Sequence, residues 1–203
     1  KLMTKAIWVV KVNNDGIITE FVEKPTEFIS DLAIIGIYYF KDGEYLKQEL
    51  QYLLDNNIKE KGEFQLTNAM ENMKNKGYKF VPGKVDEWLD CGNKNSTVYT
   101  NQRMLEIKKA TRLIHPSVFN NNSIIIEPCF IDEGVVLNNS VVGPYVSVGK
   151  GSSITNSVVS NSIIQQNTHI VQSTISNSML GSHVTYKGKA DDLSLGDYST
   201  CEQ

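Results

Sequence analysis

The strongest constraint on the fold is a short repeat in the second half of the sequence. From residue 131 to residue 180, an aliphatic side chain recurs every five or six positions. The repeated positions are Ile131, Leu137, Val142, Val148, Ile154, Val159, Ile164, Ile170, Ile175 and Leu180. This period is typical of a hexapeptide β-helix, in which each side of a triangular coil points one aliphatic residue inward. At three sides per coil the segment would hold about four coils, enough to bury a continuous core.

The composition of the same region supports this interpretation. Between about residues 115 and 185 the sequence has little charge, no helical periodicity and abundant Ser, Asn, Val and Ile. Asn-Ser or Gln-Ser pairs precede aliphatic residues at several points, beginning at residues 139, 156, 161, 172 and 177. A loose β-sandwich is the alternative, but the regularity of the period argues against it. We predict an all-β left-handed parallel β-helix over residues 111–203, with the polar tail from Tyr186 capping or wrapping the last coil.

Residues 1–110 show a different pattern, in which strands alternate with helices. Such alternation indicates an α/β domain, here with a mixed sheet. The segment 32–40 is a continuous apolar run, which predicts a strand buried on both faces. The expected strands are residues 7–12, 17–23, 32–40 and 79–85. The expected helices are residues 43–57, 62–75 and 96–109.

The overall composition narrows the functional classes. Of 203 residues, 40% are hydrophobic and 21% are charged, as in ordinary globular proteins. The formal net charge of −3 gives no electrostatic reason to expect nucleic acid or an anionic membrane as partner. No signal peptide and no membrane-length apolar run is visible. The three cysteines are far apart and lack metal-ligand spacing, so free thiols in a cytoplasmic protein are expected.

Four motifs follow one another in the first half of the chain. They are residues 21–25 (FVEKP), 30–38 (SDLAIIGIY), 62–69 (GEFQLTNA) and 88–92 (WLDCG). Each alone is a weak signal, but together the set resembles the sugar-1-phosphate nucleotidyltransferases of the glucose-1-phosphate thymidylyltransferase type. The resemblance covers about residues 6–107. The predicted β-helix resembles the C-terminal extension that many of these enzymes carry.

The resemblance implies a sugar-phosphate site near the second predicted strand. Glu23 would accept hydrogen bonds from sugar hydroxyls, and Lys24 would meet the phosphate as a point charge. Ile34 and the backbone around Gly36 resemble the family's contact with the sugar ring. Without the resemblance, a solvated strand end would be the better interpretation of Glu23 and Lys24.

The resemblance also implies a Mg²⁺ site. Asp90 resembles the second of two carboxylates that hold Mg²⁺ between the nucleotide phosphates and the sugar phosphate, with Trp88 and Leu89 packed behind it. A hard divalent ion takes oxygen ligands and often only one or two carboxylates. The structural alternative is an Asp that caps a turn. Glu63 and Thr67 resemble positioning residues, or else ordinary residues of a helix first turn.

Three departures from the family pattern bear on the function. Trp8 and Asp31 stand where the family often has Gly and Asn. The family's Gly-rich loop with an Arg, which cradles the triphosphate, does not occur in this sequence. The chain opens at Lys1 without a starting Met, so we expect that it begins inside the domain. We therefore expect a fragment that is inactive alone, taken from an enzyme that converts a nucleoside triphosphate and a hexose 1-phosphate into a nucleotide sugar and pyrophosphate, as in polysaccharide biosynthesis.

Two alternatives remain open on the sequence. Hexapeptide β-helices often belong to acyltransferases that use a His as base, and His169 and His183 are candidates, although turn histidines are the favoured interpretation. The β-helix could also be a non-catalytic assembly module, because its flat aliphatic faces suit self-association. A homo-oligomer is expected in either case.

Overall fold

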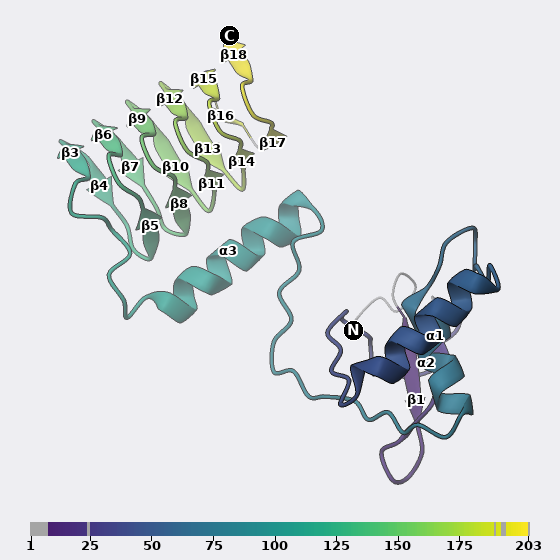
Figure 1. Ribbon diagram of the computed structural model, residues 1–203. Coiled ribbons are helices and arrows are strands. Elements are labelled where there is room, and N and C mark those ends of the chain that lie inside the picture. The colour runs from purple at the N-terminus through teal and green to yellow at the C-terminus, as the bar shows by residue number, and fades with distance from the viewer. Residues whose placement is uncertain (1–7, 24, 189, 192–193, 203) are drawn as a thin grey trace. The chain divides into compact units, whose positions relative to one another are not determined.

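The computed structural model describes residues 8–23, 25–188, 190–191 and 194–202. The chain forms two compact units, residues 1–88 and residues 89–203 (Figure 1). None of the helices in this described part of the chain has the length and apolar character needed to cross a bilayer. The predicted order, an α/β region followed by a parallel β-solenoid, is confirmed.

The first unit is built on a β-hairpin and two helices. β1 (Val9–Val12) pairs antiparallel with β2 (Ile18–Val22). The turn between them is closed by Asn13, whose side chain accepts hydrogen bonds from the amides of Asp15 and Ile17. The helices are α1 (Gly43–Asp55) and α2 (Leu66–Asn75), close to the predicted ranges.

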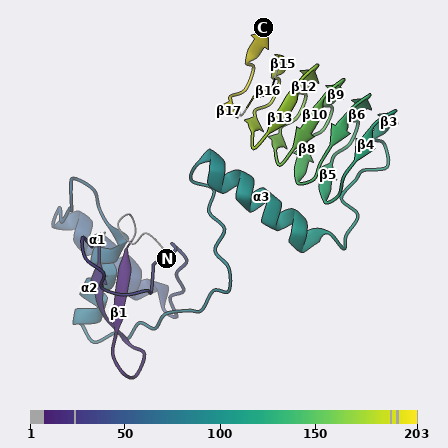
Figure 2. The same cartoon turned by 180° about the vertical axis from the view of Figure 1, so that it is seen from behind.

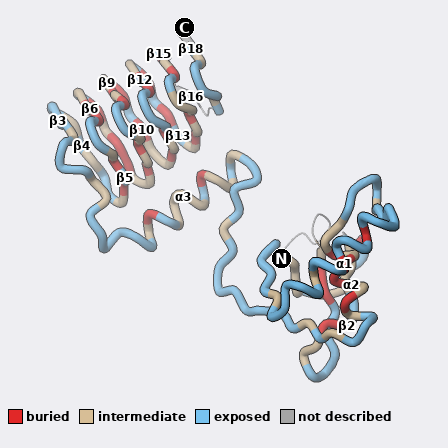
Figure 3. Tube along the Cα trace, in the orientation of Figure 1, coloured by how far each residue is buried: buried red, intermediate tan, exposed pale blue. Residues whose placement is uncertain are grey.

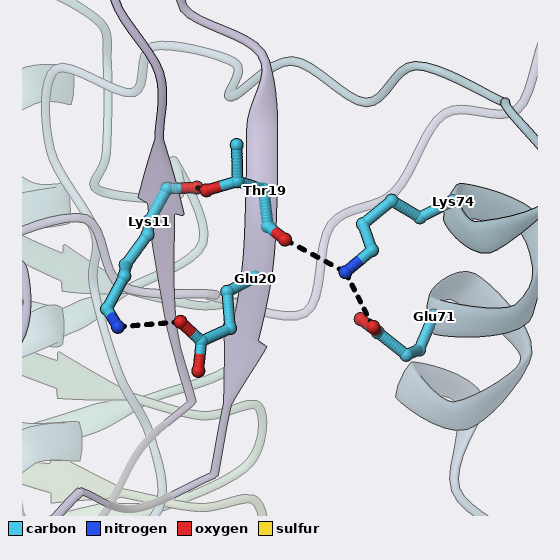
Figure 4. Close-up of polar contacts among 5 residues, drawn as sticks. All are labelled: Lys11, Thr19, Glu20, Glu71 and Lys74. Atoms are coloured by element: carbon cyan, nitrogen blue, oxygen red, sulfur yellow. Dashed lines mark hydrogen bonds and ion pairs between the residues drawn. The ribbon is translucent and has the colours of Figure 1, made fainter.

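Side chains from both helices and both strands form the core of this unit. Its fully buried members include Val9, Leu53, Ala69 and Met73. Lys74 links α2 to the hairpin, because its ammonium donates to the Thr19 carbonyl of β2 at 2.8 Å. The same ammonium also donates to Glu71, one turn earlier on α2, at 2.5 Å. Figure 4 shows these contacts beside the exposed ion pair of Lys11 with Glu20 on the strands. The sheet and the helices thus hold each other in place.

Two of the predicted strands are wrong. In the segment 32–40 only Ala33 forms a β-bridge among the described residues, and it does so with Val9. Ile37 and Tyr39 are 78% and 89% exposed, so this run is not a strand buried on both faces. In the segment 79–85 one backbone hydrogen bond to another strand is found among the described residues, from the Ile18 amide to the Phe80 carbonyl at 2.8 Å. Apolar composition suggested strands, but within the described residues these backbones pair with a neighbour only at Leu32–Ile34 and at Phe80.

The second unit contains α3 (Lys94–Lys108) and a parallel β-solenoid with three sheets. The first sheet contains β4 (Ile124–Ile125), β7 (Val141–Val142), β10 (Val158–Ser160), β13 (Thr174–Ser176) and β16 (Ala190–Asp191). The second contains β5 (Cys129–Ile131), β8 (Val146–Val148), β11 (Ile163–Ile164), β14 (Met179–Leu180) and β17 (Ser194–Leu195). The third contains β3 (Phe119–Asn121), β6 (Val136–Asn138), β9 (Ser153–Thr155), β12 (His169–Val171), β15 (Thr185–Lys187) and β18 (Thr200–Glu202). Successive strands of the third sheet lie side by side in both views (Figure 2).

The predicted period of inward residues is confirmed. All ten aliphatic positions between residues 131 and 180 are at most 2% exposed, and they form one continuous core (Figure 3). Strands β3 to β14 make the expected four sets of three. The tail does more than cap them, because β15, β16 and β17 add a further set and β18 extends the third sheet. Tyr186 takes the inward position there and is fully buried.

The Asn-Ser pairs explain how the chain turns its corners. Asn139, Asn156 and Asn177 have φ near +50°, a left-handed conformation that Asn adopts more readily than most residues. The following serine points inward, and its hydroxyl bonds across the coils. The Ser157 hydroxyl, for example, donates to the Thr155 carbonyl at 2.7 Å and accepts from the amide of the serine sixteen residues later at 3.1 Å. In each repeat the asparagine therefore makes the corner, and the serine supplies hydrogen bonds to the polar backbone groups that are buried there.

Candidate functional site

One edge of the first unit's sheet brings several predicted site residues together. Val9 pairs with Val22 on one side and with Ala33 on the other, antiparallel in both cases. β2 and the segment that contains Ala33 therefore run in the same direction and leave the sheet at the same edge. Glu23 follows Val22 and Ile34 follows Ala33. Their backbones emerge two strand spacings apart, which is roughly 10 Å.

Trp8 occupies the middle of this edge. It directly precedes Val9, and its carbonyl accepts a hydrogen bond from the Ile34 amide at 2.9 Å. Its side chain is partly buried. The residue that departs from the family pattern thus stands between the two backbones that the sequence predicts to contact the sugar.

Glu23 is engaged by a lysine that the sequence analysis did not identify. The Lys61 ammonium lies 2.8 Å from Glu23 Oε1, and the two side chains are 70% and 15% exposed. The hydrogen bond to Glu23 is the main cause that raises the pKa of Lys61 above its ordinary value. The pair joins two points 38 residues apart in the chain, so local sequence patterns could not reveal it.

A tight turn presents Lys61 to Glu23. The backbones of Glu60 and Glu63 exchange two hydrogen bonds, at 2.9 and 3.0 Å. The two residues between them, Lys61 and Gly62, both have positive φ, +52° and +87°. This is the pattern of a type I′ turn, in which a non-glycine residue at a positive φ is uncommon. The turn lies shortly before α2 and overlaps the start of the third sequence motif.

The other predicted sugar-side residues are placed as follows. Lys24 lies outside the described residues. Gly36 has φ +83°, which favours glycine, and a Cβ there would have no atom within 4 Å. Asp31 is exposed, and the adjoining Ser30 hydroxyl accepts the Leu32 amide at 3.1 Å. The surface around Gly36 is therefore open to an incoming molecule.

Glu63 and Thr67 flank the start of α2. Glu63 is exposed, and its carboxylate accepts a hydrogen bond from the side-chain amide Nε2 of Gln65 at 3.4 Å. Thr67 is 6% exposed, and its hydroxyl has no hydrogen-bond partner among the described residues. Both remain predictions as positioning residues.

Asp90 lies in the second unit, where it forms a turn just ahead of α3. Its Oδ1 accepts a hydrogen bond from the Gly92 amide at 3.1 Å, as expected of a turn-capping Asp. A Cβ on Gly92 would come within 3.3 Å of both carboxylate oxygens, so the glycine lets the carboxylate pack over the turn. Asp90 is exposed. Trp88 is 44% exposed and Leu89 is partly buried, and the expectation that they pack behind the carboxylate stays a prediction.

The donor chemistry of this turn fits a hard divalent cation shared with a ligand. A Mg²⁺ ion takes oxygen donors and is commonly held by one or two carboxylates together with substrate phosphates. Asp90 supplies one accessible carboxylate. In the described part of the chain, no group of three or more His, Cys, Asp or Glu side chains could hold an ion without such help. Asp90 is therefore suited to bind a metal only jointly with a phosphate.

The two solenoid histidines have structural contacts. The Nδ1 atom of His169 lies 2.7 Å from the Ser153 hydroxyl in the neighbouring strand. The His183 ring stacks on Tyr198 with ring centroids 4.8 Å apart. These contacts favour the interpretation of both as turn and surface histidines.

Comparison with known proteins gives one family and several relatives. Residues 7–107 match a family model described as "Nucleotidyl transferase". A "Glucose-1-phosphate thymidylyltransferase" of Streptomyces antibioticus is 26% identical over 215 residues, which cover 96% of this chain and 59% of that protein. The namesake from Streptomyces griseus is 24% identical, with 98% of this chain and 60% of that protein covered.

Two further relatives carry different names. The "Low-salt glycan biosynthesis nucleotidyltransferase Agl11" of Haloferax volcanii is 27% identical, covering 91% of this chain and 55% of that protein. The "Bifunctional protein GlmU" of Clostridioides difficile is 26% identical, covering 80% of this chain and 38% of that protein. This chain spans little more than half the length of the two thymidylyltransferases and of Agl11.

Proposed function

We propose that this chain, whose residues 7–107 match the nucleotidyl transferase family model, supplies the sugar-phosphate side of a sugar-1-phosphate nucleotidyltransferase site. The observation that carries the proposal is the shared sheet edge from which Glu23 and Ile34 emerge on either side of β1. A hexose 1-phosphate needs hydroxyl acceptors and cations within one sugar length of each other. This edge and the neighbouring Lys61 provide both.

The residues at the edge have distinct proposed roles. Glu23 accepts hydrogen bonds from sugar hydroxyls, and the ring rests against Ile34 and the open surface at Gly36. Lys24 meets the phosphate. Lys61, already held at Glu23 and 70% exposed, orients the Glu23 carboxylate and adds positive charge. Arranged in this way, the site would hold the sugar by directional hydrogen bonds and the dianion by charge.

The chemistry follows from positioning and charge. A phosphate oxygen of the hexose 1-phosphate attacks the α-phosphorus of the nucleoside triphosphate in line. A new phosphorus–oxygen bond forms, the bond to the bridging oxygen breaks, and pyrophosphate leaves with that electron pair, without a covalent enzyme intermediate. Mg²⁺, when bound, supplies charge neutralisation between the two phosphate groups. Asp90 is the residue that we propose holds it.

We further propose that residues 1–203 do not release pyrophosphate alone. The Gly-rich loop with an Arg that cradles a triphosphate in the resembled family does not occur in this sequence. Purified chain incubated with a nucleoside triphosphate, hexose 1-phosphate and Mg²⁺ should therefore show only background release. Turnover well above that background would contradict the proposal.

The sugar-phosphate site can be tested by calorimetric titration with glucose 1-phosphate and mannose 1-phosphate. Glu23→Ala should weaken binding roughly 10- to 100-fold, because a charged acceptor of sugar hydroxyls contributes about 1.5–3 kcal/mol. Glu20→Ala is the matched control, since Glu20 also lies on β2 but pairs with Lys11 at the surface. Equal affinity in all three proteins would refute the role of Glu23.

The solenoid is proposed to assemble the chain into a homo-oligomer in the cytosol. The outward positions of the β4–β7–β10 sheet are Ile124, Val141 and Val158, and the first and last are 62% and 44% exposed. A two-fold interface brings the same patch of both copies together, and an uncharged row meets its own copy without charge repulsion. In sedimentation experiments, Val158→Glu should lower the oligomer mass, whereas Lys187→Glu on another sheet should not. A wild-type monomer at micromolar concentration would rule out this assembly.

A further inference from the structure

Residues 89–107 are assigned differently by sequence and by packing. By sequence it lies inside the family match, which extends to residue 107. By packing it lies in the second unit, together with the solenoid. We propose that the solenoid, acting through α3, holds the Asp90 turn in place, and that Thr100, Asn101 and Tyr145 are positioning residues for the Asp90 carboxylate. The proposal rests on the metal-binding role of Asp90 given above.

The first step is the attachment of the turn to α3. The Thr100 hydroxyl donates to the Asp90 carbonyl at 2.7 Å. The Thr97 hydroxyl donates to the Asn93 carbonyl at 2.8 Å and to the Cys91 carbonyl at 3.2 Å. Two threonines one turn apart on α3 therefore hold the backbone that directly follows the Asp90 side chain, at the Asp90 and Cys91 carbonyls.

The start of the helix is fixed independently. The Asn93 side chain caps α3 by accepting the Ser96 amide at 3.0 Å and donating to the Ser96 hydroxyl at 2.9 Å. An N-cap of this kind is worth about 1 kcal/mol and sets the direction in which the chain enters the helix. The Asp90 turn is thus anchored to a helix end with a defined geometry.

The second step is the attachment of α3 to the solenoid. The Asn101 side chain lies between two solenoid groups: it donates to the Tyr145 carbonyl at 3.2 Å and accepts from the Ser147 hydroxyl at 2.5 Å. One turn further along, the Tyr145 hydroxyl donates to Glu106 at 2.7 Å. This bond is the main cause that lowers the pKa of Glu106 and raises the pKa of Tyr145.

A second attachment lies near the start of the helix. The Lys94 ammonium donates to the Asn177 carbonyl at 3.0 Å. From Lys94 to Asn101 the helix rises roughly 10 Å, at 1.5 Å per residue. Asn177 and Tyr145 are at equivalent corners two coils apart, which is also roughly 10 Å at the usual strand spacing. The rise of the helix therefore matches the stacking of the coils.

The apolar contacts follow the same spacing. Val98 and Leu105, seven residues apart on α3, are 1% and 5% exposed. Most other side chains of the helix are partly or fully exposed, so this narrow stripe and the polar contacts determine how α3 is seated. A helix fixed at two heights on a rigid stack has little freedom to slide or turn. The Asp90 turn, which is bonded to this helix, is held equally firmly. A metal ligand needs such a fixed position, because an error of about 1 Å in its placement weakens binding and catalysis.

The test uses the whole chain and two readouts. The first is hydrogen exchange of the backbone amides of residues 89–93. Thr100→Val keeps the shape of the side chain and removes the hydroxyl, and it should speed exchange there at least about fivefold, as loss of one hydrogen bond of roughly 1 kcal/mol implies. Thr100→Ser should restore the slow exchange. Thr111→Val, which removes a hydroxyl bound to the Lys108 carbonyl at the far end of α3, is the matched control.

The same readout tests the solenoid side. Asn101→Ala and Tyr145→Phe alter contacts with the solenoid and leave the Thr100 hydroxyl unchanged. They should also speed exchange in residues 89–93, while the solenoid amides keep their protection. Unchanged exchange in these two variants and in Thr100→Val would overturn the positioning role.

The second readout separates this inference from the proposed function. Mn²⁺ binding is measured by electron paramagnetic resonance in the presence of glucose 1-phosphate, with Asp90→Asn as reference. Weaker Mn²⁺ binding in Thr100→Val, with rescue in Thr100→Ser, supports the inference. If Asp90→Asn weakens binding but Thr100→Val does not, the positioning role fails and the metal role stands. If Asp90→Asn binds Mn²⁺ as the wild type does, the metal role fails, and hydrogen exchange alone still decides whether the solenoid holds the turn.

Discussion

The solenoid and the first unit bury apolar residues in opposite ways. In the solenoid, every aliphatic residue of the six-residue period is at most 2% exposed. In the first unit, Ile37 and Tyr39 are 78% and 89% exposed although they lie in the apolar run 32–40. The first unit has no smaller share of apolar residues than the solenoid, so the number of apolar residues does not explain the contrast.

The difference lies in where each backbone finds its hydrogen-bonding partner. In the solenoid, a strand pairs with the strand 15 to 17 residues away, and that partner recurs along the whole stack. In the first unit, the segment 32–40 pairs with β1 only around Ala33. A local, repeated pairing supplies each strand with neighbours, and an isolated sheet edge does not.

The contrast is tested most strongly by truncating one isoleucine in each region. Ile170 is fully buried in β12, so Ile170→Ala should lower the free energy of unfolding of the solenoid by roughly 2–5 kcal/mol. Ile37→Ala, at a side chain 78% exposed, should change stability by less than about 0.5 kcal/mol. Urea denaturation followed by circular dichroism measures both. Equal losses would mean that Ile37 is covered in solution and that the comparison fails.

A second test concerns the buried hydroxyls of the solenoid. Ser157→Ala removes the acceptor of the Ser173 amide, which is buried and would be left unpaired. The expected loss is about 1–3 kcal/mol, the cost of a buried polar group without a partner. Thr174→Ala, at the exposed side chain directly after Ser173, is the control and should cost far less. A neutral Ser157→Ala would show that the corner serines are tolerated and do not stabilise the stack.

These two regions also show what the sequence can reveal. The period from Ile131 to Leu180 identified the inward residues because each coil repeats one local rule. The continuation of the solenoid was missed because Tyr186, an aromatic residue, takes the inward position there. A Cβ at Gly188 would lie 2.9 Å from the Tyr186 hydroxyl, so the glycine makes room for the larger ring. The match between Tyr186 and Gly188 can be recognised only once the fold is known.

The candidate site was predictable only in part. The motifs led to Glu23, Ile34 and Asp90, and the register of the sheet brings the first two to one edge. Lys61 was missed because it reaches Glu23 from a turn 38 residues away, and a lysine in a turn carries no signal of its own. Apolar runs predicted strands correctly only where a partner strand follows.

A third test concerns the first unit, where charge supplements a small core. Glu49 on α1 is 6% exposed and pairs with Lys76 at the end of α2. Lys76→Gln would leave that carboxylate without its cation, and we expect a loss of about 1–2 kcal/mol, discounted because Lys76 is 57% exposed. Lys11→Gln, in the exposed pair with Glu20, should cost less than about 1 kcal/mol. Denaturation of the first unit measures both, and equal effects would mean that burial of Glu49 does not matter.

The smallest expected effect is at the surface of the solenoid, where Lys150 and Glu133 pair between neighbouring coils at 2.7 Å. The hydrogen bond and charge of Lys150 lower the pKa of Glu133 below its ordinary value. When the pKa of a carboxyl group is lower in the folded than in the unfolded state, its ionised form stabilises the fold. This contribution to the stability is present above the unfolded pKa and is lost as the pH falls through the folded pKa. Lys150→Met should therefore raise the pKa of Glu133 and remove the contribution of this pair to the loss of stability at acid pH.

Nuclear magnetic resonance titration of the Glu133 carboxyl carbon measures that change directly, and Lys187→Met, at an exposed lysine of β15, is the control. Because both partners of the pair are exposed, the solenoid should keep nearly all of its stability at neutral pH after the substitution. A large loss of stability would mean that ion pairs between coils, rather than the aliphatic core and its corner serines, hold the stack together. The contrast with the first unit, where one buried carboxylate depends on its lysine, would then disappear.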